Sequence, residues 1–301
     1  LCEQGRNFAN KIWNAFRLVN GWQQRTTDIP SSASDEIAIR WMRSRLNEAI
    51  ASVDEDFVKF RISDSLMTVY KLIWDDFCAW YLEMIKPGFE QPMSRQTYEA
   101  TVSIFEDVLK VLHPFMPFIS EEVWQHLKVR NQGEAITISS WPEGGAIDTS
   151  LLSEFNGFSE LVSGIRNVRK ELNLPNRDAI EVRYLSSSGY RTAFAENVKR
   201  LCNVSVLEAA DVKEDGWYSF VVGTQEFFMP LSGDVDVAAE REKIAAELDY
   251  TRGFLESVMK KLSNEKFVNS APAAVVAAET KKKEDAESKI RIMEEKLKSL
   301  S

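Results

Sequence analysis

Two clusters of lysine near the end of the sequence could bind phosphate groups. Lys260, Lys261 and Lys266 form the first cluster, and Lys281, Lys282 and Lys283 form the second. Residues 236–301 carry 13 Lys/Arg and 13 Asp/Glu, whereas the other 235 residues carry 24 and 33. Clustered cations on an otherwise acidic chain are typical of a nucleic-acid contact made through phosphates. Charge alone, however, favours the simpler interpretation of a solvated helical surface with mixed charge.

Two heptad-patterned segments position these lysines. In the first, Val237, Ile244, Thr251 and Val258 recur every seven residues, as do Arg241, Leu248, Leu255 and Leu262; in the second, the series are Ala286, Met293, Leu300 and Ile290, Leu297. This is the seam of a coiled coil. The link between them ends at Pro272, which suits the first turn of a helix. The spacing therefore predicts an antiparallel hairpin about 43 Å long, at about 1.5 Å per residue.

The composition limits the class of protein. A chain of 301 residues with 44% hydrophobic content is expected to hold two or three domains. No apolar run approaches 18 residues, so we expect no membrane span. The three cysteines are scattered and there are only two histidines, which argues against a disulfide framework and a zinc site and favours a cytoplasmic location. The first residue is not Met, so we expect a piece of a longer protein.

The hydrophobic periodicity predicts a mainly α protein in three parts. Residues 1–145 are expected to form a helical bundle, 146–235 a small α+β module, and 236–301 the coiled-coil hairpin. In the bundle, the spacing predicts helices over 3–22, around Trp41, from Phe57 through Phe60 to Trp80, over 94–112 and from Ser120, followed by an extended segment at 136–138. In the module, it predicts strands at 180–184 and 204–207, and a hairpin of 219–222 with 226–229 around Gly223.

Several motifs resemble a known family. Residues 5–15 (GRNFANKIWNA) and 113–124 (HPFMPFISEEVW) are similar to the anticodon-binding bundle of class Ia aminoacyl-tRNA synthetases. Residues 261–268 (KLSNEKFV) and 271–276 (APAAVV) resemble the tip of the C-terminal coiled coil of the valyl-tRNA synthetase family. Residues 165–169 (IRNVR) and 172–175 (LNLP) are similar to the same family. The resemblance covers essentially the whole chain.

The resemblance implies the C-terminal, tRNA-binding portion of a valine–tRNA ligase. The ATP-binding signatures HIGH and KMSKS and a Gly-rich phosphate loop are absent from the sequence, so this portion is expected to be inactive alone and to hold no cofactor or metal. ATP and Mg²⁺ would serve the rest of the enzyme. The implied partner is valine tRNA, with no DNA and no membrane, and the implied state is a monomer. Valine tRNAs share A and C at the second and third anticodon positions, where base reading is expected.

The resemblance also assigns candidate contacts. Reading splayed bases needs flat groups that stack and polar groups that bind base edges. For the anticodon, we expect these in the bundle, at Arg6, Asn10, Asn14, Arg17, Trp80, Tyr81 and Glu83. For the outer corner of the tRNA, we expect phosphate contacts from the hairpin, at Arg241, Arg252, Lys260, Lys261, Lys266, Lys281, Lys282 and Lys283. No residue is assigned to catalysis.

Simpler interpretations stand beside these assignments. Asparagine inside a helix often serves a neighbouring backbone, and an aromatic pair such as Trp80 and Tyr81 near a helix end usually belongs to a core. Two other functions also remain open. The chain could belong to another class Ia synthetase such as the isoleucine type, although that type commonly ends in a cysteine-rich zinc module. Alternatively, the hairpin could dock a protein partner, which an apolar outer stripe would favour.

Overall fold

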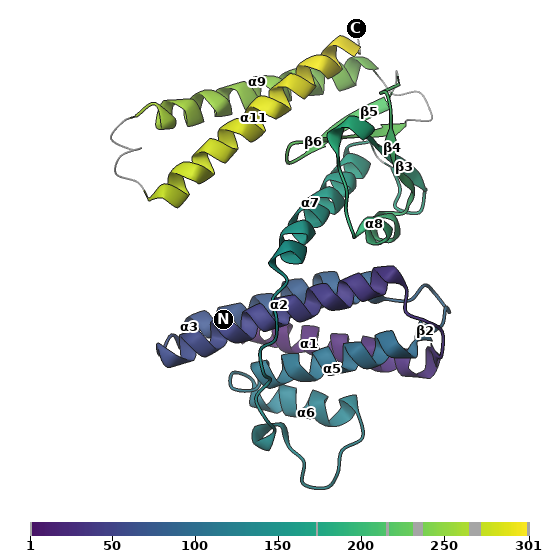
Figure 1. The fold of residues 1–301 in the computed structure, drawn as a ribbon, viewed down its shortest axis with the longest axis vertical. Helices are drawn as coiled ribbons and strands as arrows, with labels where there is room; N and C mark the ends of the chain where they lie inside the picture. Colours follow the sequence, from purple (N-terminus) through teal and green to yellow (C-terminus); the bar gives the residue numbers. More distant parts are fainter. Residues whose placement is uncertain (1, 173, 215–216, 231–236, 265–271, 300–301) are drawn as a thin grey trace. The chain divides into compact units, whose positions relative to one another are not determined.

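The computed structural model describes the chain except for residues 1, 173, 215–216, 231–236, 265–271 and 300–301 (Figure 1). The described residues divide into two compact units, one of Leu1–Asn156 with Ala193–Asn197, the other of Gly157–Thr192 with Val198–Ser301. The predicted architecture is confirmed: the fold is mainly α, with a small α+β module and a helical hairpin. Among the described residues, no helix is long and apolar enough to cross a membrane.

The first unit is a helical bundle. Its elements are α1 (Cys2–Trp22), η1 (Gln23–Arg25), β1 (Thr26–Thr27), α2 (Ala33–Val58), α3 (Ile62–Lys71), η2 (Leu72–Tyr81), α4 (Leu82–Ile85), β2 (Met93–Ser94), α5 (Arg95–Leu112), α6 (Pro117–Leu127) and η3 (Ile136–Ile138). η2 is a π-helical stretch continuous with α3 and α4. The strands β1 and β2 pair in parallel, which holds the end of α1 beside the start of α5. We call this the β1–β2 end of the bundle.

The predicted helix over 3–22 forms as α1, and its apolar side chains are buried in the core of the bundle at Phe8, Ile12, Ala15, Phe16 and Val19. The motif at 113–124 is structural here. Pro117 takes the first position of α6, where its missing N–H costs nothing. The His113 ring joins α6 to the following loop, with Nδ1 2.8 Å from Ser120 Oγ and Nε2 2.7 Å from Thr137 Oγ1.

Two predictions of secondary structure are wrong. Phe57 and Phe60 do not belong to the third helix, because α2 continues to Val58 and the chain turns at Phe60 with φ 57°. Phe60 is 88% exposed and therefore contributes nothing to the core. Residues 136–138 form a 3₁₀ turn rather than an extended segment, and only Ile136 of the three is buried.

Asp76 of η2 is a nearly buried carboxyl group inside the bundle. Its side chain is 13% exposed and accepts hydrogen bonds from Arg45 Nη2 at 3.2 Å and Nε at 3.3 Å. Burial raises the pKa of Asp76 from 3.8 to about 6, and the attraction of Arg45 opposes this rise without cancelling it. The folded bundle therefore binds a proton at this group in a pH range where the unfolded chain does not.

This raised pKa predicts a pH-dependent stability. As pH rises from about 4 to 6, the unfolded chain gives up its proton first, so the free energy of unfolding falls. The change is about 3 kcal/mol, at about 1.4 kcal/mol per pKa unit. The measurement is the unfolding free energy of wild type minus that of Asp76→Asn at each pH. A difference that stays flat between pH 4 and 7 would contradict the burial of a charged Asp76.

The second unit contains a four-stranded sheet. Its elements are the end of α7 (Thr149–Glu171), β3 (Ile180–Leu185), η4 (Ser186–Ser188), the end of α8 (Ala195–Cys202), β4 (Val204–Ala210), β5 (Trp217–Val222) and β6 (Gln225–Pro230). The strand order is β4-β3-β6-β5, with β3 and β4 parallel and the other pairs antiparallel. The predicted strands and the hairpin at Gly223, which has φ 58°, are confirmed. At Gly164 of α7, an added Cβ would lie 3.0 Å from Val222, so glycine permits this close packing of helix on sheet.

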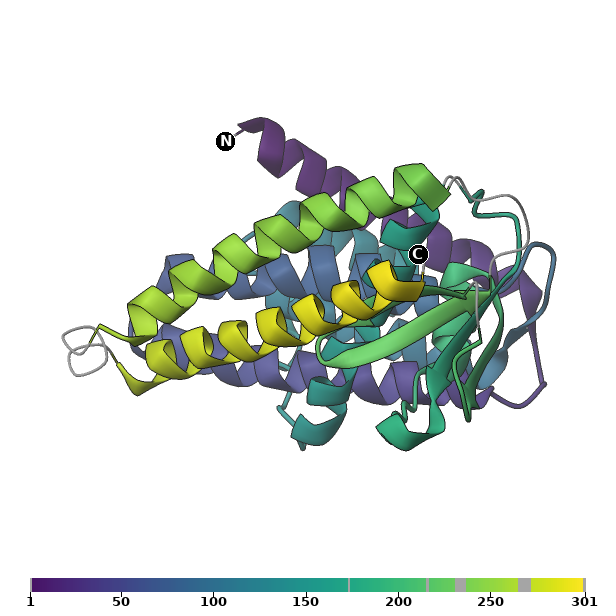
Figure 2. The same cartoon turned by 90° about the horizontal axis from the view of Figure 1, so that it is seen from above.

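The helical hairpin, which we call the arm, consists of α9 (Val237–Leu262) and α11 (Ala273–Ser299) running antiparallel (Figures 1 and 2). The predicted seam is buried at Ile244, Leu248, Thr251, Val258 and Ala286. Near the base of the arm, Ile292 is buried instead of the predicted Ile290 and Met293, because α11 also packs against β5 there. Leu300 and the side chains of Val237 and Arg241 lie outside the described residues.

Candidate nucleic-acid interface

The polar face of α1 is available to a ligand along its whole length. Arg6, Asn10, Asn14 and Arg17 are all exposed. The face does not form one site, however, because Arg6 lies 16 residues, or about 24 Å, from Trp22 at the β1–β2 end. Arg6 also pairs with Glu3 at 3.4 Å. Arg17 lies closest to the β1–β2 end of the bundle.

The predicted anticodon contacts Trp80, Tyr81 and Glu83, on η2 and α4, differ in their exposure to solvent. Tyr81 is fully buried, and its hydroxyl lies 2.9 Å from Thr101 Oγ1. Burial raises the pKa of this tyrosine far above its ordinary value. Trp80 is half-buried with its ring edge-on to Phe155 at 5.4 Å, whereas Glu83 is exposed, 3.7 Å from Lys86 Nζ. Tyr81 therefore belongs to the core, and Glu83 is the member of the group that faces solvent near the β1–β2 end.

A residue that sequence reasoning missed lies beside Glu83. Phe89 follows α4 in the loop Pro87–Pro92, and its ring is 90% exposed. The same loop leads directly into β2, so Phe89 lies at the β1–β2 end, as Arg17 and Glu83 do. The signal in the sequence was an aromatic residue after Pro87-Gly88, where no helix could bury it. An exposed ring, a guanidinium and a carboxylate at one end of a bundle suit unstacked bases.

The arm presents some of its predicted cations without partners. Lys260 and Lys281 are exposed and form no ion pair among the residues that the structure describes. Arg252 instead bridges the two helices, with Nη2 2.7 Å from Glu294, and Lys283 lies 3.7 Å from Glu287. Lys266 and the side chain of Arg241 lie outside the described residues. Of the predicted arm contacts that the structure describes, Lys260 and Lys281 are thus the exposed cations without an ion pair.

A buried carboxylate holds the outer part of the arm together. Glu279 of α11 is 7% exposed and lies 2.7 Å from Lys282 and 3.8 Å from Lys261 of α9. The hydrogen bond from Lys282, with the charge of Lys261, holds the pKa of Glu279 below its ordinary value. Lys261 and Lys282 therefore share one carboxylate across the hairpin, which reduces the charge they offer to phosphates.

Apolar side chains are also exposed on the arm. Tyr250 and Phe254, four residues apart on α9, are 77% and 41% exposed. Residues at this spacing lie on the same face of a helix. Sequence reasoning missed them because they fall outside both heptad series. Exposed aromatic rings and exposed lysines on the same arm suit a nucleic acid, since bases stack on rings while phosphates bind cations.

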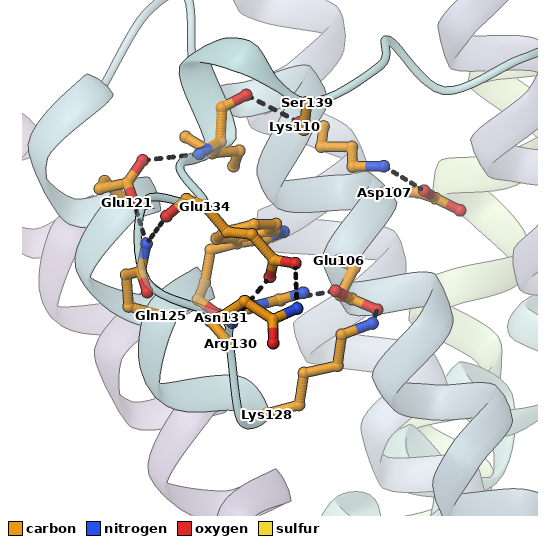
Figure 3. A network of polar contacts seen from close by, with 12 residues as sticks. Glu106, Asp107, Lys110, Glu121, Gln125, Lys128, Arg130, Asn131, Glu134 and Ser139 are labelled. Carbon is orange, nitrogen blue, oxygen red and sulfur yellow. Dashed lines mark hydrogen bonds and ion pairs between the residues drawn. The ribbon is translucent and has the colours of Figure 1, made fainter.

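The loop after α6 is fixed by a polar network in the bundle (Figure 3). Arg130 has a side chain only 7% exposed, and its Nη2 lies 2.5 Å from Glu106 of α5. Its guanidinium stacks over the Trp124 ring at 3.4 Å and donates to the Trp124 carbonyl. Lys128 completes the cluster at 2.7 Å from the other Glu106 oxygen. The network joins the loop to two helices and has no free cation for a ligand.

In the motif IRNVR (residues 165–169), Arg169 has a structural role in the second unit. Arg169 is 2% exposed and donates hydrogen bonds to the carbonyls of Pro175, Asp178, Cys202 and Asn203, at 2.8–3.2 Å. One guanidinium thus ties the end of α7 to the loop before β3 and to the α8–β4 turn.

A metal site or a reactive thiol would depend on the His, Cys, Asp and Glu side chains of the described residues. No group of three or more His, Cys, Asp or Glu is placed to hold a metal. Burial raises the pKa of Cys78 to about 12 and that of Cys202 to about 11, so both remain thiols near neutral pH.

Comparisons with known proteins agree with this arrangement. The family described as anticodon-binding domain of tRNA ligase matches residues 39–184, and the valyl tRNA synthetase tRNA binding arm matches residues 236–301. The chain is 47% identical over 301 residues to a valine–tRNA ligase of Parabacteroides distasonis and 46% identical over 302 residues to one of Christiangramia forsetii. Both alignments cover 100% of this chain. The chain belongs to the valyl-tRNA synthetase family.

The chain corresponds to the C-terminal part of these valyl-tRNA synthetases and spans about a third of their length, 34% in both cases. A more distant valine–tRNA ligase, from Bacillus subtilis, is 35% identical over 292 residues, which cover 93% of this chain. The two matched domains indicate tRNA as the partner. The arm match favours this family over the isoleucine-type synthetase and over a protein-docking hairpin.

Proposed function

We propose that the chain is the tRNA-binding part of a cytoplasmic, monomeric valine–tRNA ligase. The observation that carries this proposal is the match of the tRNA binding arm to residues 236–301, where Lys260 and Lys281 are exposed on a helical hairpin. The rest of the enzyme would hold valine, ATP and Mg²⁺. This part would hold the tRNA so that its 3′ end meets that distant active site, and would be inactive in aminoacylation alone.

Within this proposal, the two units have different tasks. Arg17, Glu83 and Phe89 at the β1–β2 end of the bundle would read the anticodon, because rings stack on bases and carboxylates accept from base amines. The arm would contact the outer corner of the tRNA through phosphates, which position a ligand without specifying sequence. Specificity for valine tRNA would therefore reside in the bundle, and much of the affinity in the arm.

A binding titration tests the proposal. The chain is titrated with valine tRNA, with the same tRNA altered at the second and third anticodon positions, and with a tRNA for another amino acid. We expect valine tRNA to bind most tightly, with log K falling against log salt by about 0.9 per phosphate contact on duplex. Equal affinity for all three RNAs, or no binding at low salt, would overturn the proposal.

Two variants locate the anticodon preference. The variants Phe89→Ala and Arg17→Ala are each expected to reduce the difference in binding free energy between valine tRNA and its anticodon variant. The reduction should be about 1–3 kcal/mol, the contribution of one lost stacking contact. Phe118→Ala is the matched control, because its ring is also 90% exposed but lies on α6, beyond the far end of α5. If this difference in binding free energy is unchanged in both test variants, the anticodon is recognised by other residues.

A further inference from the structure

A cationic pocket lies on the α+β module. The last turns of α7 and α8 and the loop after α7 line a cavity of about 660 Å³. The lining residues are Arg166, Arg169, Lys170, Leu174, Pro175, Asn176, Arg200, Leu201, Cys202 and Asn203. Four of these carry positive charge, and none of the described lining residues is a carboxylate. In a chain with a net charge of −9, such a pocket is a local exception.

Arg169 forms the inner wall of this pocket rather than a binding group. Its hydrogen bonds to four backbone carbonyls use its donors and bury its side chain. The carbonyls of Cys202 and Asn203 would otherwise present partial negative charge at the C-terminal end of α8. Those of Pro175 and Asp178 would do so in the loop after α7. With their charge offset by a guanidinium, the pocket is suited to an anion.

The other cations face solvent. Arg166, Lys170 and Arg200 are exposed, and neither Arg166 nor Lys170 has an acidic partner in the part of the chain that the structure describes. They come from two helices and converge on one cavity. Arginine binds phosphate through two parallel hydrogen bonds, and lysine binds it as a point charge.

We propose that this pocket binds backbone phosphates of the tRNA through Arg166, Lys170 and Arg200, as a contact separate from the anticodon and the outer corner. The proposal rests on the proposed function, which supplies the polyanion. The pocket is open, and its cations lie on the surface of two helices, as suits a continuous backbone. Because phosphates carry no base identity, this contact adds affinity without preference among tRNA sequences.

A structural alternative makes a different prediction. Lys170 and Arg200 lie in the last turns of their helices, where positive charge stabilises the helix dipole. If that were their only role, replacing them would lower the melting temperature and leave tRNA affinity unchanged.

The test compares two triple variants of the whole chain. Arg166→Gln, Lys170→Gln and Arg200→Gln remove the pocket cations. The matched control is Arg183→Gln, Arg191→Gln and Lys213→Gln, which removes the same residue types elsewhere on the module; Arg183 and Lys213 are already paired with carboxylates. Affinity for valine tRNA is measured from about 50 to 200 mM salt, the range in which phosphate contacts respond strongly.

We expect the pocket variant to bind valine tRNA roughly ten-fold more weakly than the wild type at low salt. The slope of log K against log salt should be shallower by about 0.9–1.8, because one or two phosphate contacts are lost. The loss should be equal for valine tRNA and its anticodon variant, and the control should keep the wild-type slope. If the triple variant melts early, the single Lys170→Gln variant carries the test, with a slope change of about 0.9.

Three results would overturn the inference. The first is wild-type affinity and slope in the pocket variant while the wild-type chain binds tRNA. The second is an equal loss in the control, which would indicate bulk charge alone. The third is saturable stabilisation of the wild type by inorganic phosphate that only the pocket variant loses, with tRNA binding unchanged; this would assign the pocket to a free anion. A wild-type chain that binds no tRNA instead overturns the proposed function.

Discussion

Replacing Arg169 with Ala is expected to lower the free energy of unfolding of the second unit by about 3–5 kcal/mol. The variant removes hydrogen bonds from a charged donor to four backbone carbonyls. Bonds of this kind are worth about 1.5–3 kcal/mol each, and a buried carbonyl left unpaired costs about 1–3 kcal/mol. Water is expected to reach about half of the freed carbonyls, which keeps the loss below the sum of the lost bonds.

Hydrogen exchange at the peptides around β3 and β4 measures this effect, because the sole tryptophan of the second unit, Trp217, contributes little to total fluorescence. Arg177→Ala is the matched control, since that side chain is 87% exposed on the same loop. It should change stability by less than about 0.5 kcal/mol. Arg169→Lys should be intermediate, because an ammonium cannot span all four carbonyls. Similar exchange in the Arg169→Ala and Arg177→Ala variants would contradict the assigned role.

The fold was predictable where the periodicity was regular. The helix α1, the strands β3 to β6 and the two helices of the arm were expected from spacing alone, since each buries one face. The error at Phe60 arose where two helices meet at a left-handed turn that lacks glycine. A hydrophobic pattern does not reveal such a turn, because the apolar residues continue through it.

The predicted contacts depend on features that a sequence pattern does not contain. Trp80 and Tyr81 lie at the end of η2, and the sequence left open whether this aromatic pair contacts a ligand or belongs to the core, where the structure places Tyr81. Lys261 looked available until the folded hairpin brought it to 3.8 Å from Glu279, which also lies 2.7 Å from Lys282 of the same helix. Arg169 did carry a signal, because it follows Val168 on the buried side of α7. A lone arginine in such a place is still ambiguous without the carbonyls that it binds.

The second large effect is expected at Arg130. Arg130→Ala should lower the free energy of unfolding of the bundle by about 3 kcal/mol, at the lower end of the 3–5 kcal/mol typical of breaking a buried ion pair. The lower end applies because Lys128 still lies 2.7 Å from Glu106 and partly offsets its charge. The loss includes the stacking of the guanidinium on Trp124 at 3.4 Å. Urea unfolding followed by tryptophan fluorescence measures it, since seven of the eight tryptophans lie in this unit.

Lys128→Ala is the control, because that side chain is 50% exposed and should contribute no more than about 1 kcal/mol. The double variant Arg130→Ala, Lys128→Ala should lose more than the sum of the single losses, since Glu106, 14% exposed, would then be buried without a partner. Adding Glu106→Gln to the double variant should recover part of that loss by removing the unpaired charge. Additive losses with no recovery would mean that Arg130 stabilises the loop through packing on Trp124, and that the ion pair contributes little.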